Sequence, residues 1–350
     1  MQKTKTILIT GSHHTPAIEL ITQLKKDKNY NWKIAYISHL YPTETHIEKT
    51  ILPKLKIDFY PLKSGKLHRR YLPYTIRDLP KIPLAIFKAY KLVKTIKPDI
   101  TVSFGGYISV PVIIASAINK VPSITHEQTL TISLSTKINS FFANKIALSF
   151  PNTKHKLPKN KVVVTGNLLR REIFKTTSQK YQKLGKTPLI YVTGGNQGSK
   201  IINQNLSKIL KNLNQKFTII HQTGINKLKQ INLSNYHPTQ YVNLNDIGWI
   251  LNRAQIIISR SGANICQEII ALKKNSILIP LFKSQQNEQL KNALWTKKQL
   301  PQKTIIIQQK NLNSSKLIQS IDKLSLNKHQ QNPIPIQINF KLLKLIHELV

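Results

Sequence analysis

Short β-branched runs alternate with longer amphipathic stretches along most of this chain, and this alternation constrains the fold more than any other feature. In the first half, five apolar runs are typical of buried parallel strands: residues 5–10, 32–37, 99–104, 121–126 and 145–150. Helical candidates such as residues 15–27 and 84–97 lie between them. Strands that alternate with helices in this way predict a doubly wound α/β domain with a parallel sheet.

A second series of strands follows the first. The polar stretch 151–161 leads to a last strand of the first series at 162–167. The later apolar runs are residues 187–195, 217–224, 239–244, 254–260 and 275–281, and residues 339–350 form an amphipathic helix. The simplest architecture is two α/β domains of similar size that face a cleft. Ligands of such sheets bind outside the carboxyl ends of the strands, so the loops after these runs are the candidate site.

The composition is that of a protein without disulfides or a membrane span. Hydrophobic residues make up 40% of the 350 residues, enough for one large core or two. The single cysteine, Cys266, excludes an intramolecular disulfide and favours a reducing compartment. The longest apolar stretches, such as residues 108–118, are shorter than the ~20 residues of a transmembrane helix. The N-terminus does not resemble a signal peptide, so we expect a soluble or surface-attached cytoplasmic protein.

The net charge of +39 predicts an anionic partner, which could be a nucleic acid, a phosphorylated ligand or a lipid surface. Only seven of the 53 basic residues are arginines. Proteins that read nucleic-acid sequence rely on the arginine fork for guanine and phosphate. The lysine-dominated charge therefore favours a solvated surface over a dedicated nucleic-acid binder.

The loop after the first strand, TGSHHTPA at residues 10–17, combines a tight turn with a helix start. Gly11 and Ser12 permit the turn, and the exposed helix N-terminus attracts an anion. His13 is placed where a general base reaches a substrate. The alternative is an ordinary strand–helix turn with two solvated histidines.

Two further loops of the first half carry unusual residues. The Gly105-Gly106 pair in SFGGYISVP allows a close backbone approach, or it is a plain turn. The segment VPSITHEQTL, residues 121–130, places His126, Glu127 and Gln128 directly behind an apolar run. Glu127 is a candidate base or a residue that orients another group; the alternative is a polar loop without a role.

The second half has a glycine-rich turn, TGGNQGSK at residues 193–200, whose free amides suit a pyrophosphate. It is neither a GxGxxG fingerprint nor a P-loop, which disfavours nicotinamide chemistry and ATP hydrolysis. In SRSGANICQE, Arg260 and the Gly262-Ala263 turn suit a phosphate, and Glu268 suits a ribose diol; the alternative is a capped helix with an incidental arginine. The amides of Gln289 and Asn292, at i and i+3, suit sugar hydroxyls or belong to a solvated helix face.

No metal site or serine-hydrolase motif is apparent from the sequence. The histidines are dispersed, and neither HExxH nor a paired-carboxylate motif occurs. A GxSxG nucleophile elbow is also absent.

Taken in order, these loops resemble those of the MurG-type glycosyltransferases of bacterial cell-wall synthesis. The resemblance covers almost the whole chain, through TGSHHTPA, SGKLHRRY (64–71), KPDITVSFGGYISVP, ITHEQ, TGNLLR (165–170), TGGNQGS, HQTG (221–224), RSGANICQE and QLKNA. It implies the GT-B fold, with two Rossmann-like doubly wound domains. The first, acceptor-binding and membrane-facing domain is expected at residues 1–165 and the donor domain at 166–333, with the C-terminal helix within 334–350 packing back on the first.

The resemblance also implies roles for single residues. Glu268 matches a ribose-binding glutamate, Leu244 falls where the family contacts uracil, and Arg170 matches an arginine near the nucleotide. The remaining donor-site positions would hold the UDP diphosphate or the sugar: Gly194, Gly195, Asn196, Gln197, Gly198, Arg260, Gly262, Ala263, Gln289, Asn292 and Thr129. The acceptor site would comprise Gly11, Ser12, His13, Gly105, Gly106, Tyr107, His126 and Gln128.

The implied reaction is an inverting transfer of N-acetylglucosamine from its UDP donor to a muramyl-pentapeptide pyrophosphoryl-undecaprenol lipid. His13 is the first choice for the base and Glu127 the second, and Arg260 with helix dipoles would stabilise the departing UDP without a bound metal or other cofactor. Residues 63–97 mix apolar and basic side chains, which suits an anionic leaflet and a peripheral location on the cytoplasmic face of the cell membrane. The alternative for their helical part is a buried helix with a lysine-rich outer face. The expected partners are therefore a UDP-sugar, a polyprenyl-pyrophosphate acceptor and the membrane, and no nucleic acid.

Four features depart from the family pattern, and one of them is NLLR at residues 167–170, which replaces Asn-Pro-Val-Arg. Ser12 stands where the family has a glycine, Asn196 replaces a serine, and Thr129 replaces the asparagine of His-Glu-Gln-Asn near the donor sugar. Two other hypotheses therefore stay open beside the cell-wall transferase. One is a related transferase with another sugar or lipid-linked acceptor, and the other is a catalytically weak binding protein on the membrane.

Overall fold

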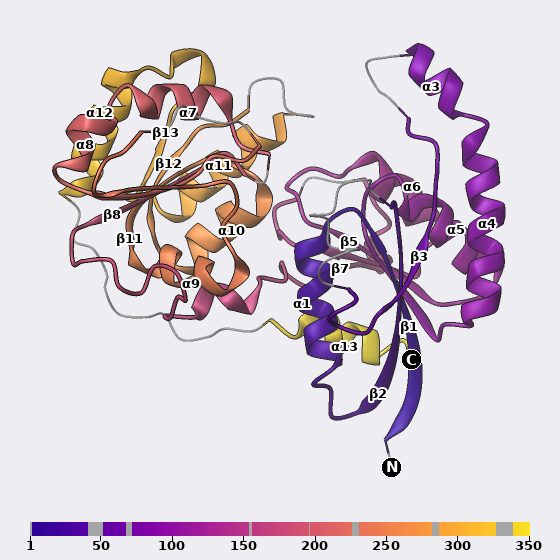
Figure 1. Ribbon diagram of the computed structural model, residues 1–350. Helices are drawn as coiled ribbons and strands as arrows, with labels where there is room; N and C mark the ends of the chain where they lie inside the picture. The colour runs from indigo at the N-terminus through magenta and orange to yellow at the C-terminus, as the bar shows by residue number, and fades with distance from the viewer. Residues whose placement is uncertain are drawn as a thin grey trace. The chain divides into compact units, whose positions relative to one another are not determined.

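The structure is a computed structural model that describes residues 2–40, 52–67, 72–153, 156–195, 197–225, 231–281, 287–326 and 339–350. The chain divides into two compact units (Figure 1). Unit 1 comprises Met1–Arg170 and Ile338–Val350, and unit 2 comprises Arg171–Gln337. The boundary between them therefore follows Arg170, whereas the sequence had suggested residue 165.

Unit 1 is built on a parallel sheet whose strand order among the described residues is β3-β2-β1-β4-β5-β6-β7. From β1 the chain adds strands toward one edge of the sheet, and from β4 it adds them toward the other edge. Strands β1 and β4 pair directly through Ile7–Gly11 and Ile100–Phe104. The loops after these two strands therefore diverge at a switch point, the usual place for a ligand in such sheets. The strands are β1 (Lys3–Gly11), β2 (Tyr30–Ser38), β3 (Asp58–Pro61), β4 (Ile100–Phe104), β5 (Ser123–Glu127), β6 (Lys145–Leu148) and β7 (Val162–Val164).

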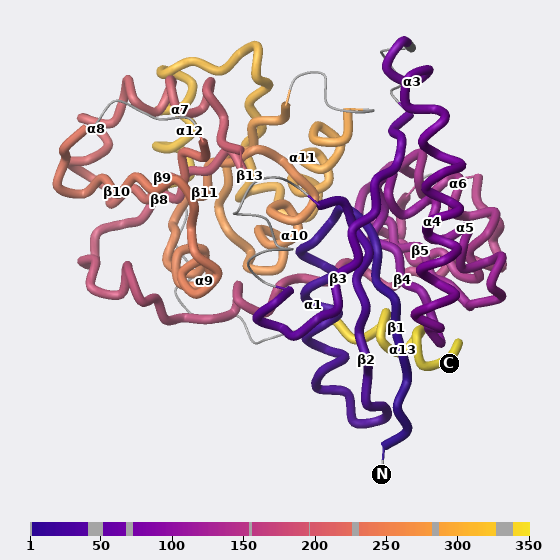
Figure 2. Tube along the Cα trace, turned by 45° about the vertical axis from the view of Figure 1, so that its right-hand side comes forward, coloured from indigo at the N-terminus to yellow at the C-terminus, as the bar shows by residue number. Residues whose placement is uncertain are grey.

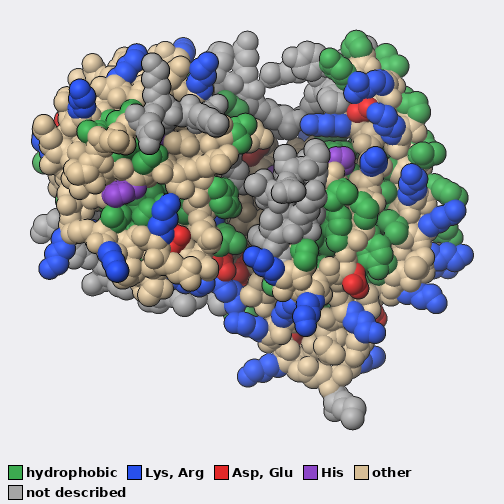
Figure 3. All heavy atoms as spheres, viewed as in Figure 1, with side chains coloured by type: hydrophobic (Ala, Val, Ile, Leu, Met, Phe, Trp, Pro, Cys, Tyr) green, Lys and Arg blue, Asp and Glu red, His purple; other side chains and the backbone are tan. Residues whose placement is uncertain are grey.

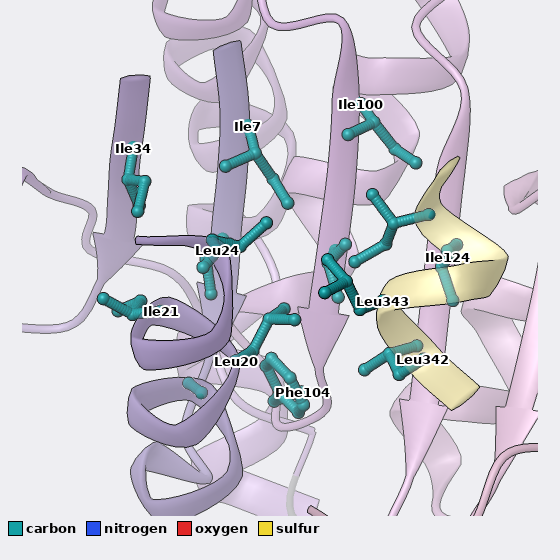
Figure 4. Close-up of a cluster of buried hydrophobic side chains, with 14 of the residues drawn as sticks. Ile7, Leu20, Ile21, Leu24, Ile34, Ile100, Phe104, Ile124, Leu342 and Leu343 are labelled. Carbon is teal, nitrogen blue, oxygen red and sulfur yellow. The ribbon is translucent and has the colours of Figure 1, made fainter. Parts of the chain in front are cut away.

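Helices cover both faces of this sheet, which is why the central strands are apolar on both sides. The helices are α1 (His14–Leu24), α3 (Leu72–Asp78), α4 (Lys81–Ile96), α5 (Ser109–Ile118), α6 (Leu134–Phe142) and α13 (Lys341–His347). On one face α1 and α13 bury Leu20 and Leu342 against Ile7 and Ile100 (Figure 4). On the other face α4 and α5 pack against the same strands.

The C-terminal helix α13 is fastened to unit 1 by a histidine–carboxylate contact. His347 Nε2 lies 2.7 Å from Asp27 Oδ2, and the His347 ring stacks on Trp32 with an interplanar angle of 2°. Burial raises the pKa of Asp27, but hydrogen bonds from Trp32, Asn29 and His347 outweigh it and leave the pKa below its usual value. The last helix of the chain is thus part of the core of the first unit, as the tube in Figure 2 shows.

Unit 2 repeats the architecture with a parallel sheet of order β10-β9-β8-β11-β12-β13 in the described part of the chain. Its switch point lies between β8 and β11, which pair along Leu189–Thr193 and Ala254–Ser259. The strands are β8 (Leu189–Thr193), β9 (Thr218–Gln222), β10 (Tyr236–Thr239), β11 (Ala254–Ser259), β12 (Asn275–Leu278) and β13 (Thr304–Ile306), and the helices are α7 (Lys200–Ser207), α8 (Leu210–Asn214), α9 (Leu244–Arg253), α10 (Ala263–Ala271), α11 (Glu288–Gln299) and α12 (Ser314–Ser325). Short 3₁₀ turns lie at Lys159–Lys161, Arg171–Phe174 and Gln309–Asn311.

The predicted fold class of two doubly wound parallel-sheet domains is confirmed, but three strand assignments change. The strand predicted at 239–244 is wrong, because the chain pairs with β9 at Tyr236–Thr239 and then starts α9 at Leu244. The short edge strands β3 and β13 were not predicted. No helix in the described ranges is both long enough and apolar enough to cross a membrane.

Candidate active site

The loops after β1 and β4 of unit 1 interlock at the switch point. The Ser12 N–H donates to Gly105 O at 3.1 Å. At Gly106, where φ is +82°, a Cβ atom would lie 2.0 Å from Ser12 Oγ. A side chain at position 106 would therefore collide with the Ser12 side chain of the β1 loop. Ser12, which stands where the family has a glycine, uses its side chain in this contact.

Three side chains from different elements surround the Cα of Gly105. A Cβ atom placed there would lie 3.6 Å from His13 Cδ2, 3.9 Å from Gln128 Oε1 and 3.9 Å from Ser135 Oγ. The structure thus brings together His13, Gly105 and Gln128, which the sequence had singled out separately. Ser135 joins them from α6 and accepts a hydrogen bond from the Gly106 N–H at 3.2 Å.

His13 occupies the N-cap position of α1 without capping the helix through its side chain, and that side chain is exposed. The surrounding protein lowers the pKa of His13 because it disfavours the imidazolium, and the nearby Glu127 carboxylate opposes this effect. Since the side chain still reaches solvent, screening by water moderates the lowering. The imidazole is neutral at pH 7 and can accept a proton.

His126 lies behind Gln128 and is fully buried. His126 Nε2 lies 3.1 Å from Gly166 O, so this nitrogen carries the proton and Nδ1 accepts from Gln128 Nε2 at 3.0 Å. Burial lowers the pKa of His126 to about 4, which keeps the ring neutral. The neutral ring holds the Gln128 amide so that its oxygen points toward Gly105.

Glu127 ends β5 and fastens the loop that follows. Its Oε1 accepts from Thr129 N at 3.2 Å and Thr129 Oγ1 at 2.9 Å, and its Oε2 accepts from Ser133 N at 2.9 Å. The carboxylate is buried. Three hydrogen bonds from the following loop therefore occupy both oxygens of the carboxylate. The hydroxyl of Thr129 is engaged with the carboxylate, and a contact of Thr129 with a sugar stays a prediction.

Two further predicted site residues of unit 1, Tyr107 and Arg170, are half-buried. Lys66 Nζ lies 6.0 Å from the Tyr107 ring centroid, and the His39 ring lies at 6.4 Å. Arg170 is the last residue of unit 1.

In unit 2 the loops after β8 and β11 meet in the same way. The Arg260 N–H approaches Thr193 O at 3.4 Å, and the Gly195 N–H donates to Thr193 Oγ1 at 3.0 Å. Apart from the two chain neighbours of each glycine, no described residue has an atom within 4 Å of a Cβ added at Gly195 or Gly262. The space next to these two glycines is therefore open to a ligand. Asn196 lies outside the described residues.

Two helices begin at these loops with uncapped N-termini. Neither Ser199, which precedes α7, nor Gly262, which precedes α10, provides a side-chain cap. The first amides of both helices keep their capacity to bind an anion, and the helix dipoles favour negative charge there. Gly194, Gln197, Gly198 and Ala263 belong to the same two loops and helix starts.

Arg260 adds a cation to this anion-binding end of the sheet. Its Nη1 donates to Ile279 O at 3.2 Å and to Pro280 O at 3.4 Å. Within the described ranges no carboxylate forms an ion pair with it. Burial lowers the pKa of Arg260, but the guanidinium stays positive at neutral pH. Carbonyl partners fix its position without neutralising its charge.

The start of α11 packs against the β11 loop. Ser261 Oγ donates to Gln289 O at 2.8 Å, and Asn292 Nδ2 donates to Ser261 O at 3.1 Å. Asn292 is 1% exposed, whereas Gln289 is half-buried and accepts from Leu281 N at 2.9 Å. Asn292 therefore supports the loop, and Gln289 lies nearer the solvent. Glu268 lies buried in the second turn of α10.

Two family models match the chain. The N-terminal domain of glycosyltransferase family 28 matches residues 9–148, and the C-terminal domain of that family matches residues 189–349. A Clostridium novyi protein is 34% identical over 341 residues, which cover 94% of this chain and 93% of the relative. This chain belongs to glycosyltransferase family 28.

Two relatives of this family 28 chain share a name. The Clostridium novyi protein is called UDP-N-acetylglucosamine--N-acetylmuramyl-(pentapeptide) pyrophosphoryl-undecaprenol N-acetylglucosamine transferase. A Bacillus thuringiensis protein of the same name, numbered 3, is 34% identical and covers 99% of both chains. Among solved structures, MurG of Acinetobacter baumannii superposes with a TM-score of 0.69 at 21% identity over 98% of this chain and 99% of that chain. The UDP-GlcNAc 2-epimerase of Neisseria meningitidis, at 16% identity, has a TM-score of 0.65 and covers 99% of each chain, and it shares the fold.

Membership of family 28 does not test the roles of single residues, which stay predictions. The geometry also shows residues that the sequence analysis did not single out. Ser133 and Ser135 escaped because α6 was not predicted, although Ser133 is a regular N-cap that accepts from Thr136 N. Gln222 was quoted only as part of a motif. Among the described residues, no group of three or more His, Cys, Asp or Glu side chains is placed to hold a metal ion.

Proposed function

We propose that this chain is an inverting glycosyltransferase that moves N-acetylglucosamine from UDP-N-acetylglucosamine to an undecaprenyl-pyrophosphoryl-N-acetylmuramoyl-pentapeptide lipid in peptidoglycan synthesis. The observation that carries the proposal is the anion-binding end of unit 2, where two uncapped helix N-termini and Arg260 adjoin open space at Gly195 and Gly262. A nucleoside diphosphate has the charge for this arrangement. Relatives 34% identical over nearly their whole length carry the name of this reaction.

In the proposed reaction an acceptor hydroxyl attacks the anomeric carbon of the donor sugar, and the bond from that carbon to UDP breaks. His13 takes the hydroxyl proton, because its imidazole is neutral, exposed and adjacent to Gly105. Glu127 is the weaker candidate, since Thr129 and Ser133 already occupy its carboxylate. The negative charge that develops on UDP is stabilised by the start of α10 and by Arg260, without a metal ion.

We assign the remaining donor contacts from the resemblance to the family. Leu244, the first residue of α9, packs on the uracil, and Glu268 of α10 accepts from the ribose hydroxyls. Gln289 contacts the sugar, with Asn292 behind it. Arg170 and Thr129 stay predicted donor contacts. The acceptor pyrophosphate binds at the loops of Ser12 and Gly106.

The lipid acceptor brings unit 1 to the anionic inner face of the cytoplasmic membrane. Along α3 and α4 large apolar side chains are exposed and interleave with lysines and arginines (Figure 3): Tyr74, Ile76, Leu79, Leu84 and Phe87, with Arg77, Lys81, Lys88 and Lys91. Cations lie over two of these rings, Lys91 at 4.6 Å from Phe87 and Arg77 at 5.2 Å from Tyr74. Such a surface inserts apolar groups while each cation contributes about 1 kcal/mol near an anionic leaflet.

Transfer from labelled UDP-sugars to a short-chain lipid acceptor tests the proposal with the purified chain. Product formation with N-acetylglucosamine and release of UDP are expected. Transfer of another sugar, or to another lipid-linked acceptor only, would support a related transferase, and UDP-sugar binding without turnover would support a binding protein.

The base is tested with two neighbouring histidines. We expect His13→Ala to lower turnover by about 10²–10⁴-fold with little change in donor affinity. His14→Ala is the matched control, because the His14 ring is bound to the Tyr36 hydroxyl at 3.0 Å. Near wild-type turnover of His13→Ala would move the base to Glu127.

A further inference from the structure

The loop after β8 that carries Gly194, Gly195 and Gly198 is called the glycine loop. The segment His221–Gly224 at the end of β9 contacts this loop backbone to backbone. A Cβ atom at Gly198 would lie 2.0 Å from Thr223 O, and one at Gly224 would lie 2.2 Å from Gly198 N. No side chain fits between these loops. The position of the glycine loop therefore depends on what holds the end of β9.

Gln222 bridges two loops of the nucleotide site with one buried amide. Its Nε2 donates to Gly195 O at 3.1 Å, and its Oε1 accepts from Val242 N at 3.1 Å. The two partners fix the orientation of the amide, because Gly195 O can only accept and the Val242 N–H can only donate. Val242 lies two residues before Leu244, where α9 begins. The side chain thus spans from the glycine loop to the segment that leads into α9.

On the opposite face of β9 the neighbouring His221 side chain, together with Asn203, holds the residues at the end of that strand. Asn203 of α7 donates from Nδ2 to Thr223 O at 3.1 Å, so its Oδ1 accepts from His221 Nε2 at 3.0 Å. His221 Nδ1 then accepts from the Tyr236 hydroxyl at 2.9 Å. Burial lowers the pKa of His221 to about 4, which keeps this chain of hydrogen bonds in one direction at neutral pH.

We propose that Gln222 is a positioning residue that sets the spacing between the glycine loop, which holds the diphosphate, and residues 242–244, which hold the nucleobase. The inference rests on the proposed function, since it assumes that a uridine diphosphate binds there. UDP must engage both loops at once, whereas uridine engages only the second. A loss of spacing therefore weakens UDP more than uridine, because the two halves of UDP no longer fit together.

The glycine loop is expected to stay folded without this bridge. Gly195 O also accepts from Gly198 N at 3.0 Å, and Asn203 holds Thr223 from the other face. Gln222→Met keeps the length of the side chain and removes both hydrogen bonds. Tyr191→Phe is the matched control, because it removes the hydroxyl that donates to the same Gln222 oxygen at 3.3 Å and leaves both loop hydrogen bonds of Gln222 in place.

The test measures the affinities of the purified full-length chain for UDP and for uridine by calorimetry, with thermal unfolding recorded for each variant. We expect Gln222→Met to weaken UDP binding by about tenfold or more and uridine binding by less than about threefold. Tyr191→Phe should change each affinity by less than about threefold. The KM for the UDP-sugar should rise in parallel with the UDP dissociation constant.

Each other outcome is decisive. Unchanged UDP affinity in Gln222→Met overturns the inference, and so does an equal loss of UDP and uridine affinity, which indicates a merely structural role. If Gln222→Met does not fold, Gln222→Asn gives the same test, because its shorter amide reaches only one of the two loops. A wild-type chain that binds no UDP would instead refute the proposed function, and the inference with it.

Discussion

Two glycines of the donor site should respond to the same substitution in opposite ways. Gly198 has a φ of +76°, and an added Cβ would lie 2.0 Å from Thr223 O. Gly262 has an ordinary backbone conformation, φ −64° and ψ 156°, and beyond its chain neighbours an added Cβ meets no atom of the described residues within 4 Å. The fold therefore requires glycine at position 198 but not at position 262.

The effects on stability follow from these geometries. Gly262→Ala should raise the free energy of unfolding by about 0.4–1 kcal/mol, because alanine restricts the unfolded chain and fits the native conformation. Gly198→Ala should lower it by more than about 2 kcal/mol, since it combines backbone strain with a clash against a carbonyl oxygen. Urea unfolding followed by circular dichroism measures both changes.

The effect of Gly262→Ala on binding tests the site itself. The new methyl group would occupy the open space at the start of α10, where the proposed diphosphate accepts hydrogen bonds from the helix amides. Moving the phosphate away from these amides costs charge-assisted hydrogen bonds, each worth about 1.5–3 kcal/mol. We expect UDP affinity to fall by at least about tenfold while uridine affinity is retained.

The reasoning has a clear refutation. A less stable Gly262→Ala protein would show that the fold itself needs this glycine. A stable Gly262→Ala protein with wild-type UDP affinity would show that no ligand approaches Gly262, and the site would have to lie elsewhere in unit 2.

Three other perturbations address unit 1. Glu127→Gln should lower the pKa of His13 further by removing the opposing charge. The acid limb of the pH–rate profile should therefore shift to lower pH. A loss of all activity at every pH would instead make Glu127 the base. Asp27→Asn should cost about 1–3 kcal/mol of unfolding free energy at pH 7. Because the folded pKa of Asp27 is lowered, that stabilisation is present above the unfolded value of 3.8 and disappears as pH falls through the folded pKa, so urea unfolding at pH 7 and pH 3 should show a shrinking difference from wild type. Phe87→Ser should weaken flotation with anionic vesicles by about tenfold, whereas Phe141→Ser, on an exposed ring of α6, should not; equal effects would argue against the α3–α4 surface.

The architecture was predictable because buried parallel strands carry long apolar runs, and the end of such a run locates a ligand loop. The error at 239–244 shows the limit of this reasoning. Those residues alternate like a strand, but Val242 N is bonded to the Gln222 side chain and Asn243 caps α9. A contact with a residue twenty positions away is not visible in a local pattern.

The roles within His126-Glu127-Gln128 were not predictable from the sequence either. Three adjacent polar residues look equivalent there, yet His126 is buried behind Gln128 and the Glu127 carboxylate is occupied by Thr129 and Ser133. These partners come from an N-cap and a turn whose positions depend on the packing of α6. The sequence indicates that this loop is polar for a reason, and the packing decides which side chain faces the ligand.

The two units solve the problem of orienting an amide in the same way, and this bears on what the pH dependence of activity reports. In unit 1 neutral His126 orients Gln128, and in unit 2 neutral His221 orients Asn203. Both histidines are fully buried, and burial lowers the pKa of each to about 4, so neither gains a proton in the range where an enzyme of neutral pH works. His13 is exposed beside Gly105, so its ring meets solvent where the two buried rings do not. An acid limb of the rate that appears well above pH 4 therefore does not report either of the two histidines that hold the loops.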